Sequence, residues 1–404
     1  MAGVFNKTGN EVTVMPAAGF RIALASVGVL TAATSLAPSA VAAGTAARPV
    51  LAYVLNDVAD TVVPLNVTTN TFGRPVKVGI GPDAIVFSPN GKTAYVASGA
   101  PGLPLRPADT VAVIDTKTNR NGRRIKVAVH PNSLVITPNG QTVYALSPTG
   151  VTPISTATKT TGPLIKVGHN PVAMTITPDG GTIYVANSHS GTVTPISTAT
   201  NKPGRPIKVG SGPDFVAVTP DGREAYVLSV TRGQQPGFNV GSVTVIRTAS
   251  KTASAPIQLN GFPSDLVFTP SGKTAYVAVA SDKQGVGTQV IPMSTATGKP
   301  GKPMQISKLG HGVPGQSYEA ITPDGKTLWV GDWWAFKVFP VNTSTGKPGK
   351  PIGVQFNPNQ IAITPDGSTV YVATGGVETT AISNSTHKII TVITGTGGIM
   401  GIDP

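Results

Sequence analysis

One short pattern constrains this chain more than any other: Ser or Thr, then Pro, then any residue, then Gly. Seven copies of it recur at a regular spacing, at 88–91, 137–140, 177–180, 219–222, 269–272, 322–325 and 364–367. The copies are spaced by 40 to 53 residues. A period of this size is typical of repeat proteins, in which one unit cannot bury its apolar faces alone and must stack on its neighbours.

Each copy is part of a longer unit with four short apolar runs. In one unit the runs are the segment before 177–180, then 182–187, 191–197 and 205–210. Val, Ile and Thr dominate these runs, as is usual for strands, and Gly, Pro, Asn and Asp lie between them. We therefore predict an all-β protein of four-stranded antiparallel blades that close into a β-propeller.

The tetrapeptide itself has a structural explanation. In Thr177-Pro178-Asp179-Gly180, Pro presets the first central position of a type I turn and Gly takes the positive φ that follows. We interpret it as the hairpin between the first and second strands of a blade, and not as a catalytic motif.

The two ends of the repeat region set the number of blades. Residues 51–56 read as a second strand with no first strand before it, and 398–403 read as a first strand with no second strand after it. We expect these segments to pair, so that the N- and C-terminal strands close the ring. Seven intact blades and one split blade make eight, with seven as the alternative if one irregular unit forms no blade.

The order of these short motifs resembles a known family. PDG, YVAN, GTV and VGxGP follow one another along about residues 50–404, as in the YVTN β-propeller repeat family of surface-layer-like and exported bacterial proteins. The resemblance implies the propeller fold. It implies no particular activity, because propellers host many unrelated functions.

Residues 1–43 differ in composition and are predicted to be a signal peptide. A lone Arg21 precedes an apolar run over 22–37, and small residues at 40–43 suit a signal peptidase. Met15 is an alternative start, and an uncleaved anchor is the other interpretation. The run is shorter than the ~20 residues of a membrane span. We expect residues 44–404 to form one domain, a monomer that is secreted, periplasmic or at the cell surface, without a stable membrane span.

Few catalytic or metal-binding motifs are present. The chain has no Cys, which excludes disulfides, thiolate zinc sites and a Cys nucleophile. No Walker loop, GxSxG elbow or HExxH motif appears. His130, His169 and His189 fall in loops predicted at one face of the ring, here called the top, and are only weak metal candidates. We expect no metal and no cofactor.

The unit at 306–340 departs most from the others. Glu319 takes a first-strand position that is apolar elsewhere, and Trp333 and Trp334 follow Asp332 in the next loop. A buried carboxylate requires a partner or water, and a partly exposed indole can stack on a flat ligand. The alternative is that the carboxylate meets channel water and the indoles only fill the blade. The sequence predicts a top-face ligand pocket formed by His311, Tyr318, Glu319, Asp332, Trp333 and Trp334.

The chain has an excess of basic residues over acidic ones. The chain has 31 basic and 18 acidic residues, a formal net charge of +13. Lys77, Lys126, Lys166 and Lys208 recur in the predicted outer strands, and Arg and Lys are frequent in the connections before them. Lys at sheet edges prevents edge-to-edge pairing, which is a sufficient structural reason. A basic rim also favours anionic partners such as cell-wall polymers, nucleic acid or lipid headgroups.

Three functions are therefore open. The first is an exported, non-catalytic propeller that binds or scaffolds an unidentified ligand or protein at its top face. The second is a propeller enzyme, of the lyase or lactonase type, using top-face His and acidic residues. The third is a protein that binds an anionic cell-wall polymer or another polyanion through its basic rim.

Overall fold

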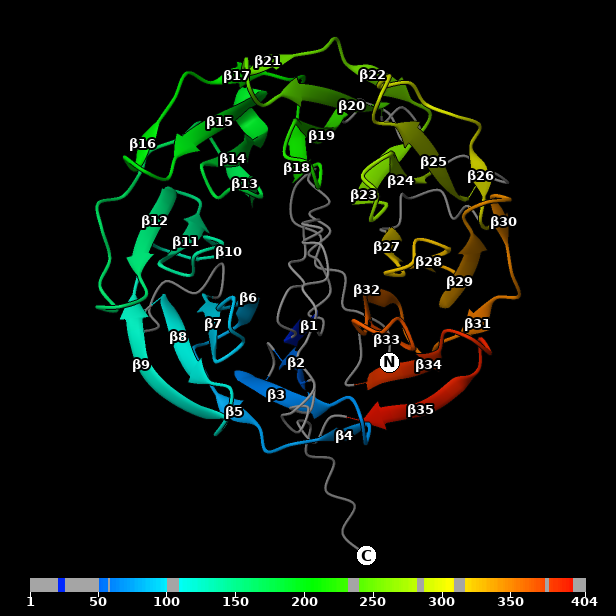
Figure 1. Cartoon of the computed structure of the whole chain (residues 1–404), viewed down its shortest axis with the longest axis horizontal. Coiled ribbons are helices and arrows are strands. Elements are labelled where there is room, and N and C mark those ends of the chain that lie inside the picture. The colour runs from blue at the N-terminus through cyan, green and yellow to red at the C-terminus, as the bar shows by residue number, and fades with distance from the viewer. Residues whose placement is uncertain are drawn as a thin grey trace, which may run out of the picture.

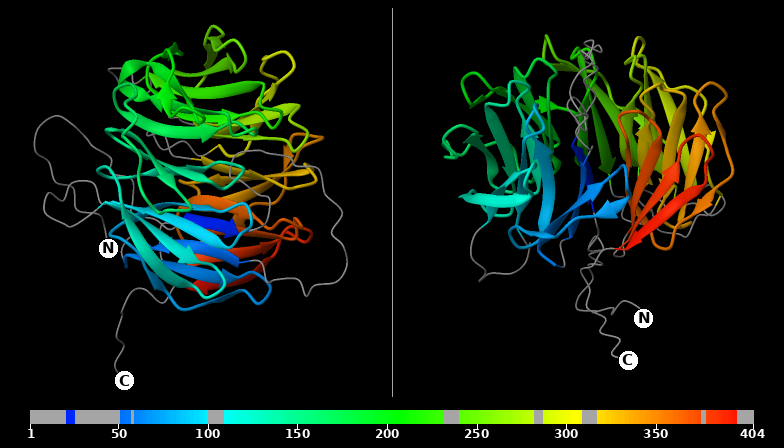
Figure 2. Two further views of the ribbon diagram at one scale, coloured as in Figure 1. Left: turned by 60° about the vertical axis from the view of Figure 1, so that its left-hand side comes forward. Right: turned by 60° about the horizontal axis from the view of Figure 1, so that its bottom comes forward.

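The computed structural model describes residues 21–25, 51–56, 59–99, 109–231, 240–281, 287–308, 317–374 and 378–394. Eight antiparallel sheets surround one central axis, as Figure 1 shows along that axis and Figure 2 from two further sides. The predicted eight-bladed propeller is thereby confirmed, and the seven-bladed alternative is excluded.

We name the blades A to H in chain order. Blades A and B contain β1 (Arg21–Ala25), β2 (Leu51–Asn56), β3 (Thr61–Asn66), β4 (Thr71–Phe72), β5 (Val76–Lys77), and then β6 (Pro82–Phe87), β7 (Thr93–Ser98), β8 (Thr110–Asp115) and β9 (Arg120–Lys126). Blades C and D contain β10 (Ser133–Ile136), β11 (Thr142–Ser147), β12 (Gly150–Ser155), and then β13 (Pro171–Ile176), β14 (Thr182–Asn187), β15 (Thr192–Ser197), β16 (Lys202–Pro203) and β17 (Ile207–Lys208).

Blades E and F contain β18 (Pro213–Val218), β19 (Glu224–Thr231), β20 (Val240–Arg247), β21 (Thr252–Ala253), β22 (Ile257–Leu259), and then β23 (Phe262–Phe268), β24 (Thr274–Ala280), β25 (Thr288–Ser294) and β26 (Met304–Gln305). Blades G and H contain β27 (Ser317–Ile321), β28 (Thr327–Asp332), β29 (Lys337–Asn342), β30 (Lys347–Pro348), β31 (Ile352–Gly353), and then β32 (Pro358–Ile363), β33 (Thr369–Thr374), β34 (Glu378–Ser383) and β35 (Ile389–Thr394). The helical element within the described ranges is a three-residue 3₁₀ turn, η1 (Ser188–Ser190), and no helix there is long and apolar enough to cross a membrane.

The apolar core is divided among the seams between blades. Because side chains alternate along a strand, each second strand sends residues to both of its neighbours. In β14, Ile183 and Val185 pack toward blade C while Tyr184 and Ala186 pack toward blade E. Eight such clusters of buried side chains fill the eight seams. Every blade is thus buried on both faces by its neighbours.

The repeated tetrapeptide forms the turn between the first two strands and also joins neighbouring blades. The Thr177 hydroxyl donates to Asp179 Oδ1 at 2.5 Å, and the Gly180 amide donates to the Thr177 carbonyl at 2.8 Å. Gly180 has φ 73°, and a Cβ on it would lie 2.6 Å from Cδ of Pro138 in the preceding blade. Hydrogen bonds from Thr177 and from the Gly181 amide lower the pKa of Asp179. The turn is therefore architectural, as predicted.

Proline determines the shape of the outer strands. In blade D, Pro203 and Pro206 interrupt the edge, which is split into β16 and β17. At the same two repeat positions blade B has Asn121 and Arg124, and there the edge is one continuous strand, β9. Blade B therefore presents a longer and more basic outer strand.

The inner edge of blade A differs from the prediction that a C-terminal strand would pair with β2. Residues 398–403 were expected to pair with β2, but Arg21–Ala25 forms the inner strand β1, in register from Arg21 opposite Leu55 to Ala25 opposite Leu51. The other edge of β2 pairs with β3, so both of its edges are occupied. Two segments of the sequence have the pattern of an inner strand, and the N-terminal one occupies this edge. Residues 398–403 lie outside the described ranges.

Hydrogen bonds from buried tyrosines join consecutive blades and close the ring. The second-strand tyrosine of one blade donates its hydroxyl to an asparagine in the turn before the outer strand of the next blade. Each of these asparagines has a positive φ, which Asn tolerates better than most residues. The pairs are Tyr53–Asn119 at 2.5 Å, Tyr144–Asn201 at 2.7 Å and Tyr371–Asn70 at 2.5 Å. The last pair joins blade H to blade A.

Replacing Tyr371 with Phe is expected to lower the apparent melting temperature by about 1–3 °C, because a net contribution of about 1 kcal/mol is lost from a bond that closes the ring. The matched control is Tyr226→Phe, since the Tyr226 hydroxyl contacts Glu224 of its own strand at 3.3 Å and does not reach another blade's asparagine. Thermal unfolding by circular dichroism measures both. Equal losses in the two variants would show that the closing bond has no special role.

Candidate functional site

The predicted pocket maps to blade G. Tyr318 and Glu319 lie in β27, Asp332 ends β28, and Trp333 and Trp334 follow it. His311 lies outside the described residues. Ser317 is opposite Asp332, and Glu319 is opposite Val330. Cross-strand partners share a face of the sheet, so Glu319 and Asp332 lie on the same face, toward blade F.

Asp332 is engaged by its own turn. Its Oδ1 accepts the amides of Trp334 and Ala335, each at 3.1 Å, and its Oδ2 accepts the hydroxyl of Ser307. The carboxylate is buried. It therefore shapes the loop that carries the indoles.

The two indoles form an edge-to-face pair. Their ring centroids are 4.6 Å apart and the rings are inclined at 89°. Both residues are half-buried, and the Trp333 carbonyl accepts a hydrogen bond from Asn357 at 2.8 Å. Each indole keeps part of its surface open, so the structure leaves room for the predicted stacking role.

Glu319 is the most unusual residue of the six. It is 5% exposed, and neither of its carboxyl oxygens has a hydrogen-bond partner. Its backbone amide donates to Asp265 Oδ2 of blade F at 2.8 Å. Burial raises the pKa of Glu319 well above its usual value, the Asp265 charge raises it further, and the nearby Ala278 amide lowers it somewhat. Burial also raises the pKa of Asp265 to about 6, against the opposing effect of the Glu319 and Leu266 amides. Two coupled acids thus meet at the F–G seam.

Replacing Glu319 with Met, the residue at the same position of blade D (Met174), is expected to stabilise the fold by about 1–3 kcal/mol at pH 8, because an unpartnered polar group is removed. Raised pKa values in the folded state mean that these acids favour folding below their unfolded values of 4.5 and 3.8 and oppose it increasingly as the pH rises.

Melting temperature measured from pH 4 to pH 9 should fall more steeply for the wild type than for Glu319→Met. The second variant, Glu319→Gln, removes the ionisation but keeps a buried polar group. It should flatten the pH profile in the same way with a smaller gain. If the dependence of melting temperature on pH were the same in both variants as in the wild type, the raised pKa assigned to Glu319 would be contradicted.

Two surface cavities stand out in the structure, and neither is lined by any of the six residues. The smaller, about 390 Å³, is lined by Thr322, Pro323, Asp324, Asp366, Gly367 and Asn384. Its two aspartates accept hydrogen bonds from Thr322 and Thr364 of their own turns. This cavity is formed by the repeated turns of two neighbouring blades. The predicted ligand pocket on blade G stays a prediction.

The larger cavity, about 600 Å³, lies between blades A and B. Its lining residues are Ala59, Asp60, Lys77, Val78, Gly79, Ile80, Thr110, Arg124 and Lys126. Three cations and a single carboxylate surround it. Sequence reasoning placed Lys77, Arg124 and Lys126 on a general basic rim and missed the cavity. The available signal was the absence of Pro at both positions 121 and 124, because the unbroken strand β9 places Arg124 near the lysines.

The histidines named as weak metal candidates lie apart from both cavities. His130 Nδ1 is 3.5 Å from Asp109 Oδ1. His169 and His189 are exposed, and the backbone amide of His189 donates to the His169 carbonyl at 3.2 Å. Within the described ranges, no three His, Asp or Glu side chains gather closely enough to hold a metal ion.

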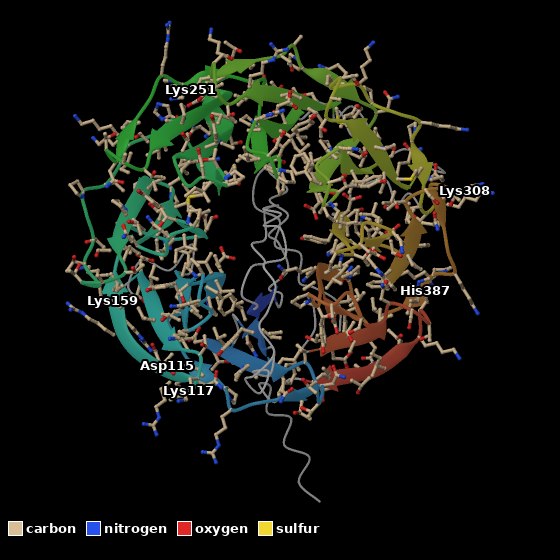
Figure 3. The ribbon with its side chains drawn as sticks, viewed as in Figure 1. Asp115, Lys117, Lys159, Lys251, Lys308 and His387 are labelled. Atoms are coloured by element: carbon tan, nitrogen blue, oxygen red, sulfur yellow. The ribbon has the colours of Figure 1, made fainter. Side chains whose placement is uncertain are left out.

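The basic rim has few acidic partners. In the part of the chain that the structure describes, Lys and Arg form ion pairs only at Arg223–Asp221 and Lys326–Asp324, each at 3.7 Å within one turn. Lys117, Lys159, Lys251 and Lys308 are at the outer circumference of the ring (Figure 3). The positive charge of the rim is therefore largely not neutralised by the protein itself.

Comparison with solved structures confirms the propeller. Hydrazine synthase of Kuenenia stuttgartiensis is 23% identical with a TM-score of 0.59, over 79% of this chain and 96% of that one. Dihydro-heme d1 dehydrogenase NirN is 14% identical with a TM-score of 0.66, over 85% and 72%. A protein of unknown function from Desulfotomaculum acetoxidans is 17% identical with a TM-score of 0.56, over 76% and 96%. No family model and no curated protein matches the sequence. These likenesses show the fold alone.

Proposed function

We propose that this protein is an exported, non-catalytic propeller of the YVTN repeat type that binds an anionic polymer at the cell exterior through its outer rim. The observation that carries the proposal is the row of outer-strand and turn cations whose charge is not neutralised by neighbouring acids. A polyanion that follows the circumference would meet one basic group after another.

The repeat gives this rim a regular spacing. Lys126, Lys166 and Lys208 occupy the same outer-strand position in successive blades B, C and D, and all three are exposed. A single exposed ion pair contributes little, but a polymer that contacts many cations at once releases its counterions and gains affinity. This supports a long anionic chain as the partner better than a small acidic ligand acting at one lysine.

The second candidate is a ligand at the top face of blade G. The half-buried pair of Trp333 and Trp334 supports it, because partly exposed indoles offer flat apolar surface to a ring-shaped ligand. Glu319, one of the two coupled acids at the F–G seam, lies on the same blade. This candidate and the rim use different surfaces, so they are separable by mutation.

Binding to the rim should depend steeply on salt. For long-chain polyphosphate, we expect affinity to fall at least tenfold between 50 and 200 mM salt, since several contacts are each screened. Replacing Lys202, Arg205 and Lys208 with Gln should weaken binding and reduce the salt slope, while Trp333→Ala should change neither. Fluorescence anisotropy measures both quantities. Salt-independent binding, or loss in Trp333→Ala alone, would favour the top-face candidate.

Export predicts a mature N-terminus near Ala43 or Gly44. Mass spectrometry of the protein from the extracellular or surface fraction measures it. Cleavage at this site would remove β1 and leave the inner edge of β2 open in the mature protein. An N-terminus at Arg21 or upstream in that fraction would keep β1 in blade A and would contradict cleavage at this site. A protein found only inside the cell would contradict export itself.

A further inference from the structure

We infer that the cavity between blades A and B is a discrete binding site for a phosphate group. The inference rests on the proposed function, since the group would be a terminal phosphate of the polymer at the rim. It goes further, because it assigns one seam of the ring a specific ligand chemistry that the other blades do not share.

The walls of the cavity supply the charge. Lys77 projects from β5 of blade A, and Arg124 and Lys126 project from β9 of blade B. The two strands are held together where the Asn121 side-chain amide donates to the Lys77 carbonyl at 2.7 Å. Asp60 also lines the cavity, but its Oδ1 accepts the Gly81 amide at 2.9 Å. Three cations therefore face one carboxylate that is already engaged by the backbone.

The floor supplies an unused hydrogen-bond donor. Thr110 lies opposite Lys126 in the β8–β9 pairing and lines the cavity. Its side chain is 5% exposed, and its hydroxyl has no hydrogen-bond partner. A buried hydroxyl without a partner incurs a desolvation cost that a bound acceptor would offset. Gly79 forms the adjoining wall, where a Cβ would lie 2.5 Å from Cβ of Ser98 and 3.0 Å from the Thr110 hydroxyl.

The other seams differ in sequence at these positions. Blade D has Pro206 and Lys208 where blade B has Arg124 and Lys126, and blade E has Pro256 and Gln258. The C–D seam therefore combines Lys166 with Lys208 alone. Arg124 is the addition, at a position that Pro occupies in blades D and E, and its planar guanidinium suits an oxyanion that accepts two hydrogen bonds.

The balance of charge indicates the class of ligand. Three cations against one carboxylate leave an excess that a single carboxylate group would not neutralise. A phosphate monoester carries about −1.5 to −2 charge at neutral pH and presents three acceptor oxygens. These oxygens match the donors available from two ammonium groups, one guanidinium and one hydroxyl.

The test uses the full-length protein and two triple variants. The first variant removes the three cations that line the cavity and combines Lys77→Gln, Arg124→Gln and Lys126→Gln. The second variant removes three positive charges from blades C and D and combines Lys166→Gln, Arg205→Gln and Lys208→Gln. Isothermal titration with inorganic phosphate should give one saturable site in the wild type and in the second variant. The first variant should bind at least tenfold more weakly. Thr110→Val, which keeps the shape and the charge, should weaken binding several-fold.

Each outcome separates this site from the proposed function. No saturable phosphate binding by the wild type, or equal losses in the two triple variants, would overturn the site, whereas polyphosphate binding could persist. Acetate bound as tightly as phosphate would overturn the phosphate assignment. Failure of the wild type to bind polyphosphate, with phosphate binding retained, would overturn the rim function and leave the cavity as a small-ligand site.

Discussion

The packing of each blade against both neighbours is the interaction on which the rest of this structure depends. A four-stranded sheet with two apolar faces is not stable alone, and here each seam buries one cluster of side chains. Tyrosine–asparagine hydrogen bonds reinforce the A–B and C–D seams through Tyr53–Asn119 and Tyr144–Asn201, and Tyr371–Asn70 does the same where blade H meets blade A. A closed ring leaves no seam open, so every blade contributes to the stability of all the others.

Because the blades depend on packing against one another, residues at the seams cannot change freely, whereas residues at the outer edge can. The turn Thr177–Gly180 fixes both a hairpin and a contact with the preceding blade, so its side chains have little freedom. Outer strands contact only one neighbour within their own sheet, and their exposed residues can change without loss of core packing. Basic residues are concentrated there and not in the apolar cores of the seams. The composition of the rim is therefore open to selection for binding.

The sequence was sufficient for the architecture because each repeat carries the same turn and strand signals. It was insufficient at the inner edge of blade A, since the segments 21–25 and 398–403 are both short and largely apolar in sequence, and periodicity cannot rank them. Glu319 stood out in the sequence, because an acid at an apolar repeat position is visible without coordinates. The neighbouring acid Asp265, which accepts the Glu319 backbone amide, was missed, because that contact crosses a seam between two blades.

Blades G and B each depart from the repeat, and the two departures have different energetic consequences because one lies in the packed core and the other at the outer edge. At the F–G seam an acid replaces an apolar side chain within the core, where it has no partner and opposes folding as the pH rises. At the A–B seam the loss of two prolines alters only the outer edge, so the core is unchanged while β9 continues and brings Arg124 beside Lys126. A change at the edge is thus tolerated at little energetic cost, and it adds a positively charged cavity to a surface that the other blades repeat without it.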